Sequence, residues 1–130
     1  MSPNRLSGRT IIVVEDHDDA RTAIDRFLNR LGATVVAAKD GLEGLEAVKN
    51  YHPHLVVTDL LMPGMDGFKL LREIRALPPE AGGSTPVIAM TALDGRLERT
   101  RILSLGFRAC LQKPFAVETL LETILYLLDR

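Results

Sequence analysis

The sequence contains little cysteine and no long hydrophobic run. Its single cysteine, Cys110, cannot form an internal disulfide, which is typical of proteins kept in a reducing compartment. The longest apolar runs are far shorter than the roughly 20 residues that span a bilayer. The first ten residues also lack the apolar core of a secretory signal. We therefore expect a cytoplasmic protein that does not insert into a membrane.

The chain also lacks an excess of charge of either sign, with 16 basic and 17 acidic residues. Domains that bind nucleic acid usually carry a net basic face, so we expect no direct nucleic-acid partner. A chain of 130 residues is long enough for one hydrophobic core but not for two. We expect a polar lead over residues 1–9 and a single domain over residues 10–130, with no output domain after the last helix.

Short β-branched runs alternate along the chain with longer segments of helical period. The expected strands are Thr10–Val14, Thr34–Ala38, His54–Thr58, Pro86–Met90 and Ala109–Gln112. The expected helices are a stripe from Ala20 to Leu31, then Leu42–Asn50, Phe68–Leu77, Gly95–Leu105 and Val117–Asp129. Five successive βα units indicate an α/β fold: one doubly wound, flavodoxin-like sheet of five parallel strands in the order 2-1-3-4-5, with five helices on its two faces.

Several local features follow from the same patterns. Asp18 or Asp19 is expected to cap the first helix, and Asp66 the third. In the second helix we expect Leu42 to face inward together with Leu45 and Val48. Cys110 is expected to be a small buried hydrophobic residue.

Polar residues collect at the carboxyl ends of the expected strands, where open α/β sheets bind their ligands. Glu15 and Asp16 follow the first strand, and Asp59 follows the third. Because these two strands are neighbours in the expected order, three carboxylates should meet in one crevice. Their mutual repulsion calls for a cation, and a site made of oxygen ligands suits Mg²⁺.

Two further polar residues reach the same edge of the sheet. Thr91 ends the fourth strand, and Lys113 follows the fifth. A hydroxyl and an ammonium group are suited to hold a phosphoryl group opposite the carboxylates. The implied chemistry is in-line transfer of a phosphoryl group to a carboxylate.

Four motifs occur in order at these strand ends. They are Glu15-Asp16, the run DLLMPGMDG at residues 59–67, Met90-Thr91-Ala92 and Lys113-Pro114-Phe115. Together they resemble the receiver domains of two-component response regulators, and the resemblance covers the chain from the first strand onward. It implies that Asp59 is the phosphoacceptor of a phosphorelay.

The resemblance also implies a metal site and a switch. Mg²⁺ would be held by Asp59, by Asp16 directly, by Glu15 mainly through water and by the backbone carbonyl of Leu61. Thr91 and Ala92 would form the phosphoryl-binding switch together with Lys113. Receivers often place an aromatic residue three positions before this lysine, and here that position is Cys110.

The partners implied by the resemblance are a histidine kinase or a histidine phosphotransfer protein as donor, and an effector that binds the face of the fourth helix, fifth strand and fifth helix. The domain would be a phosphoacceptor signalling domain rather than an enzyme. It would assist only its own Mg²⁺-dependent phosphotransfer and dephosphorylation.

Other interpretations remain open for single residues and for the whole chain. Asp16, Asp59 and Lys113 could each be an ordinary turn or surface residue, and only their joint placement favours a site. A haloacid-dehalogenase-like phosphatase would carry a second aspartate two residues after the first, where this chain has Leu61. A receiver fold that is never phosphorylated is a third possibility. His17, His52 and His54 are expected to be exposed residues rather than metal ligands.

Overall fold

The computed structural model describes residues 4–92 and 96–129. Five parallel strands form one sheet in the order β2-β1-β3-β4-β5, as predicted. The strands are β1 (Thr10–Val14), β2 (Thr34–Ala38), β3 (Leu55–Asp59), β4 (Val87–Thr91) and β5 (Ala109–Gln112). The predicted bounds of β1, β2 and β5 are confirmed, whereas β3 and β4 each lie one residue later. Asp59 and Thr91 are therefore the last residues of their strands and share the rigidity of the sheet.

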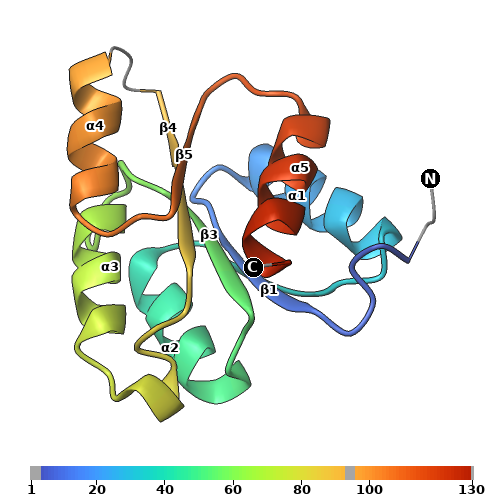
Figure 1. Ribbon diagram of the computed structural model, residues 1–130, viewed down its shortest axis with the longest axis horizontal. Helices are drawn as coiled ribbons and strands as arrows, with labels where there is room; N and C mark the ends of the chain where they lie inside the picture. The colour runs from blue at the N-terminus through green and yellow to red at the C-terminus, as the bar shows by residue number, and fades with distance from the viewer. Residues whose placement is uncertain (1–3, 93–95, 130) are drawn as a thin grey trace.

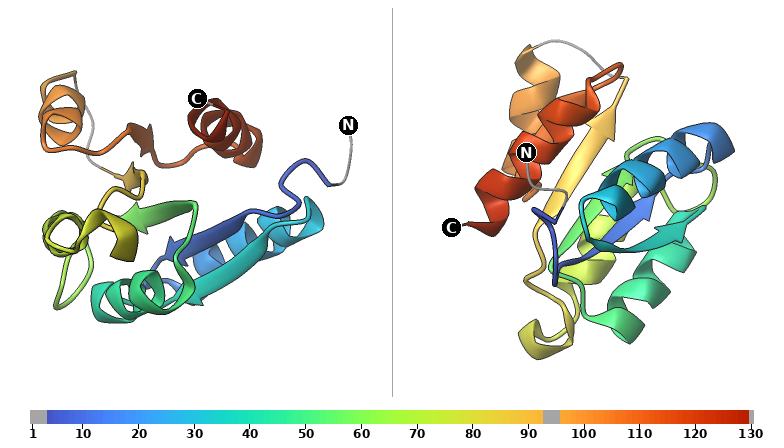
Figure 2. Two further views of the ribbon diagram at one scale, coloured as in Figure 1. Left: turned by 60° about the horizontal axis from the view of Figure 1, so that its bottom comes forward. Right: turned by 90° about the vertical axis from the view of Figure 1, so that its right-hand side faces the viewer.

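Helices cover both faces of this sheet (Figures 1 and 2). They are α1 (Asp18–Arg30), α2 (Gly41–Tyr51), α3 (Gly67–Arg75), α4 (Arg96–Ser104) and α5 (Val117–Leu128). Figure 1 shows α1 and α5 on one side of the strands, and α2, α3 and α4 on the other. A short 3-10 helix, Pro79–Ala81, lies in the segment between α3 and β4. Gly95, the expected first residue of the fourth helix, lies outside the described residues.

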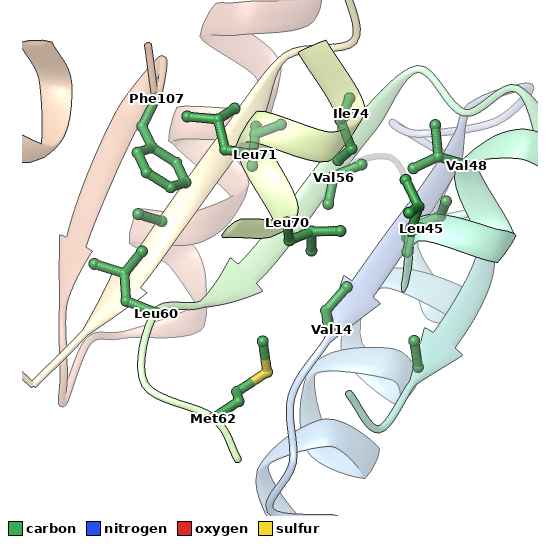
Figure 3. Close-up of a cluster of buried hydrophobic side chains, with 14 of the residues drawn as sticks. Val14, Leu45, Val48, Val56, Leu60, Met62, Leu70, Leu71, Ile74 and Phe107 are labelled. Atoms are coloured by element: carbon green, nitrogen blue, oxygen red, sulfur yellow. The ribbon is translucent and has the colours of Figure 1, made fainter. Parts of the chain in front are cut away.

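Two hydrophobic cores result from the alternation of side chains along the buried strands. Ile11 and Val13 of β1 belong to the core under α1 and α5, while Ile12 and Val14 belong to the core under α2, α3 and α4. Successive strand residues point to opposite faces, so a strand covered on both sides must be apolar at every position. Figure 3 shows the second core, where Val14 faces side chains of α2 and α3.

The helix starts confirm one predicted cap and correct another. Asp66 caps α3, because its Oδ1 accepts a hydrogen bond of 2.8 Å from the backbone amide of Lys69. At α1 the N-cap is His17, whose side chain makes no capping hydrogen bond to any described residue. The predicted cap at Asp18 or Asp19 was wrong, since both lie inside the first turn. There their negative charges are stabilised by the positive end of the helix dipole.

The predicted inward face of α2 needs one correction. Leu45 and Val48 are buried, but the side of the helix that carries Leu42 faces solvent, and Leu42 is 61% exposed. Successive helical residues are rotated by about 100°. A face centred on Gly44, Leu45 and Val48 therefore leaves Leu42 more than a quarter turn away from the core.

The amino-terminal segment takes part in the fold. Leu6 is fully buried in the core under α1 and α5, and its backbone amide donates a hydrogen bond of 2.8 Å to the carbonyl of Leu31. The expected polar lead over residues 1–9 thus supplies a core residue. Within the described residues, none of the helices has the length and apolar character needed to cross a bilayer.

The two leucines of α2 make a matched test of these packing assignments. We expect Leu45→Ala to lower the free energy of unfolding by about 2–5 kcal/mol, because it removes buried contacts and leaves a cavity. Leu42→Ala should change it by about 0.5 kcal/mol or less. Urea unfolding followed by circular dichroism would measure both, and equal losses in the two variants would contradict the orientation of α2.

Candidate functional site

The carboxyl ends of the central strands place the predicted site residues next to one another. Glu15 directly follows β1, and Asp59 ends β3, which pairs with β1 in parallel. Carboxylate oxygens of Glu15, Asp16 and Asp59 and a ring nitrogen of His17 all lie within 4.8 Å of one another. The predicted meeting of three carboxylates is therefore found, and His17 joins them.

Backbone contacts hold the two acidic segments in place. The Glu15 amide donates to the Ala38 carbonyl at 3.0 Å, and the Arg21 guanidinium donates to the Glu15 carbonyl at 2.9 Å. After β3 the chain turns sharply, and the Gly67 amide donates to the Leu60 carbonyl at 2.9 Å. A Cβ at Gly67 would collide with the Asp59 carbonyl, so only glycine permits this close approach.

Lys113 connects the ends of β1, β3 and β5. Its Nζ donates to Oε1 of Glu15 at 2.7 Å and to Oδ2 of Asp59 at 3.0 Å. The Glu15 side chain is fully buried and that of Asp59 is 8% exposed, while Lys113 retains 27% exposure. Its backbone amide also donates to the Thr91 carbonyl at 2.7 Å. One ammonium group thus serves two buried carboxylates that would otherwise repel each other.

The surroundings alter the acidity of both Glu15 and Lys113. Burial raises the pKa of Glu15 above its usual value, and the neighbouring Asp59 carboxyl raises it further, against the opposing effect of the ammonium group. Burial alone would lower the pKa of Lys113. Hydrogen bonds to Glu15 and Asp59, with the charges of these carboxylates, outweigh it and raise that pKa instead. The site therefore keeps its lysine charged.

Asp16 supplies the observation that tests whether a cation fits. Its Oδ1 is buried and has no hydrogen-bond partner within the described part of the chain. A buried carboxylate oxygen without a donor is costly, and a divalent cation would relieve that cost. Clustered carboxylates are hard oxygen ligands of the kind that Mg²⁺ prefers. The residues present thus fit a divalent metal ion.

The structure also describes the remaining predicted residues, Thr91, Ala92, Leu61 and Cys110. Thr91 is buried at the end of β4, and Ala92 is exposed directly after it. The Leu61 side chain is 56% exposed, and the part of its backbone carbonyl in metal binding stays a prediction. Cys110 is buried, as predicted.

Sequence reasoning missed the contacts of His17 and of Lys113. His17 was expected to be an exposed residue, and its side chain is 73% exposed, yet its Nδ1 lies beside the carboxylates. Its position directly after the acidic pair is a signal that could have found it. The pairing of Lys113 with Glu15 joins residues 98 positions apart, and no local pattern indicates it.

Comparison with known proteins agrees with this geometry. The family described as the response regulator receiver domain matches residues 11–125. The Regulator of RpoS from Escherichia coli (strain K12) is 38% identical over 109 residues, which cover 84% of this chain and 31% of that protein. The chain thus spans about a third of the length of this curated relative.

Two solved structures share the fold over nearly their whole length. The receiver domain of the Francisella response regulator 1452 has a TM-score of 0.86 and 28% identity, covering 95% of this chain and 98% of that one. The receiver domain of the sensor histidine kinase PA1611 from Pseudomonas aeruginosa PAO1 has a TM-score of 0.84 and 30% identity, covering 95% and 100%. The latter structure holds a magnesium ion coordinated in its active site cleft.

The double pairing of Lys113 predicts a stability defect in the metal-free protein. Removing one partner of a buried ion pair costs about 3–5 kcal/mol. The partial exposure of Lys113 reduces this, so we expect Lys113→Ala to lower the free energy of unfolding by about 1–3 kcal/mol. Urea unfolding in the presence of EDTA would measure it.

Two controls isolate the ion pair. Lys49→Ala removes an exposed lysine that pairs with Glu46 at 3.7 Å, and it should cost about 0.5 kcal/mol or less. In a Glu15→Gln background, Lys113→Ala should cost less than in the parent, because one buried carboxylate, that of Asp59, then loses its partner instead of two. Equal losses in the two backgrounds would show that Glu15 and Lys113 do not stabilise each other.

Proposed function

Because the chain belongs to the family of response regulator receiver domains, we propose that Asp59 accepts a phosphoryl group from a phosphohistidine on a partner protein. The observation that carries this proposal is the position of Asp59 at the end of β3, beside two further carboxylates and the ammonium group of Lys113. We further propose that the domain is a signalling switch in the cytoplasm rather than an enzyme with an external substrate.

The transfer requires a carboxylate nucleophile and stabilisation of the phosphoryl charge. An Asp59 carboxylate oxygen attacks phosphorus while the bond from phosphorus to the histidine nitrogen breaks, and the bonding electron pair stays on that nitrogen. Lys113 already donates to Asp59 Oδ2. After transfer the same ammonium group is close enough to donate to a phosphoryl oxygen. It therefore stabilises the negative charge both on the carboxylate before transfer and on the acyl phosphate after it.

The carboxylates also provide for a metal ion. Asp16, Glu15, Asp59 and the Leu61 carbonyl would hold Mg²⁺, which supplies positive charge for the phosphoryl oxygens when bound. The free Oδ1 of Asp16 supports direct binding by this residue. Oε1 of Glu15 already accepts a hydrogen bond from Lys113, which supports binding of the metal by Glu15 mainly through water.

An apolar groove beside the site is suited to the donor protein. Ala20, Ala23 and Ile24 of α1 line it together with Phe115, and Glu15 and Lys113 also belong to its lining. A donor that docks on this surface would bring its phosphohistidine to the carboxylates. We propose that the donor is a histidine kinase or a histidine phosphotransfer protein.

The proposed output face is formed by α4, β5 and α5. A groove there is lined by residues that include Arg99, Cys110 and Tyr126. The Arg99 guanidinium donates to the Cys110 carbonyl at 2.8 Å, so α4 is tied to β5. We propose that Thr91 and Ala92 transmit phosphorylation to this face by moving the segment after β4.

The small side chain of Cys110 limits the switch. Cys110 stands where many receivers carry an aromatic ring, and it has too little area to drive a rotation by burial. Phe107 is buried and packs edge-on against Phe68 of α3, with ring centroids 6.1 Å apart. Figure 3 shows Phe107 in the core beside Leu71. We propose that Thr91 carries the response without an aromatic partner at position 110.

Phosphorylation of Asp59 can be tested directly. With acetyl phosphate and Mg²⁺, intact mass spectrometry should show a gain of one phosphoryl group, and Asp59→Asn should abolish it. Asp129→Asn changes an exposed aspartate just after α5 and should be labelled like the parent. Labelling of Asp59→Asn at the parent level would assign the acceptor to another residue.

The two metal ligands next to β1 should differ in importance. We expect Asp16→Asn to lower Mg²⁺ affinity by at least about tenfold, because it removes the free carboxylate oxygen. Glu15→Gln should lower it less, since one oxygen of Glu15 already accepts from Lys113. NMR titration with Mg²⁺ would give both affinities, and an unchanged affinity in Asp16→Asn would remove this residue from the metal site.

A further inference from the structure

The imidazole of His17 faces the same space as the carboxylates. Its Nδ1 lies 3.5 Å from Oε2 of Glu15 and 3.4 Å from Oδ1 of Asp16. The side chain is otherwise largely exposed, so it is free to adjust its position. A nitrogen donor thus borders a group of oxygen donors at the end of β1.

Helix capping does not account for this placement. His17 is the N-cap residue of α1, but its side chain makes no capping hydrogen bond to a described residue. The backbone of His17 forms the hydrogen bond that begins the helix, since its carbonyl accepts from the Arg21 amide at 2.9 Å. Oδ1 of Asp16 remains without a hydrogen-bond donor within the described residues, although Nδ1 is its neighbour.

The spacing of these atoms is close to that of adjacent ligands around one ion. Ligands at right angles about an octahedral ion with bonds of about 2.1 Å lie roughly 3.0 Å apart. The two distances from Nδ1 exceed this value by only a few tenths of an ångström. A small rotation of an exposed side chain would bring the imidazole to a coordinating position.

We propose that His17 is an additional, nitrogen ligand of the metal site, which makes this site bind octahedral transition-metal dications such as Co²⁺ or Mn²⁺ more tightly than Mg²⁺. Imidazole suits first-row transition metals, whereas Mg²⁺ prefers oxygen ligands and water. The carboxylates would bind either kind of ion, whereas the imidazole of His17 would coordinate only the transition-metal ion. This inference rests on the proposed metal site of the receiver domain.

The test compares Co²⁺ with Mg²⁺ in the parent and in His17→Ser, which keeps a favourable N-cap residue and removes the imidazole. Calorimetric titration at one fixed pH should show Co²⁺ affinity falling by about tenfold or more. Mg²⁺ affinity, measured by NMR titration, should stay within about twofold, because Mg²⁺ prefers water over imidazole at that position in the parent as well. Proton NMR of the Co²⁺ form should show strongly shifted imidazole signals that disappear in His17→Ser.

Controls separate this site from surface binding and from loss of the fold. His52→Asn removes an exposed histidine at a left-handed position, which asparagine tolerates, and it should leave Co²⁺ affinity unchanged. Asp16→Asn should weaken both ions, which shows that they share one site. Circular dichroism confirms that each variant is folded.

Two outcomes would overturn the role of His17. Unchanged Co²⁺ affinity in His17→Ser would show that the imidazole does not coordinate. A rise in affinity for both ions would show that His17 acts instead as a competing cation beside the carboxylates. Phosphorylation of Asp59 with acetyl phosphate and Mg²⁺ would survive either result, so failure here is distinct from failure of the proposed function.

Discussion

The pairing of Lys113 with two buried carboxylates is the interaction on which the rest of the site depends. Parallel strands bring Glu15 and Asp59 to the same edge of the sheet, where like charges in a buried setting would be costly. The ammonium group offsets this by donating to both, at 2.7 and 3.0 Å. Both carboxylates therefore have a hydrogen-bond donor in the protein itself, and the side chain of Asp59 is oriented by it.

The same arrangement leaves a carboxylate oxygen of the site without a hydrogen-bond donor in the part of the chain that the structure describes. Lys113 satisfies one oxygen each of Glu15 and Asp59, but Oδ1 of Asp16 has no donor among the described residues. In the proposed function, a divalent cation would bind the carboxylate oxygens to which the lysine does not donate. His17 lies at the border of this space, and its nitrogen extends the range of cations that the carboxylates can serve.

Most of the fold could be predicted because strand and helix patterns are local. The runs Thr10–Val14 and Ala109–Gln112 are strands with the predicted bounds, since a strand buried on both faces is apolar throughout. The errors arose where pattern alone leaves a choice. Leu42 has the spacing of a core residue but faces solvent, and His17 takes the N-cap position for which Asp18 seemed better suited.

The sequence by itself determined the family of folds and which polar residues lie at the carboxyl edge of the sheet, because each motif directly follows or ends a recognisable strand. It also indicated that Asp59 would meet other carboxylates, since neighbouring parallel strands end at one edge. Only the tertiary structure decided which atoms pair there. Whether Lys113 reaches Glu15, and whether an oxygen of Asp16 stays free, depends on side-chain positions across residues far apart in the chain. Local sequence patterns do not predict the distances between these side chains, because the packing of the whole sheet determines them.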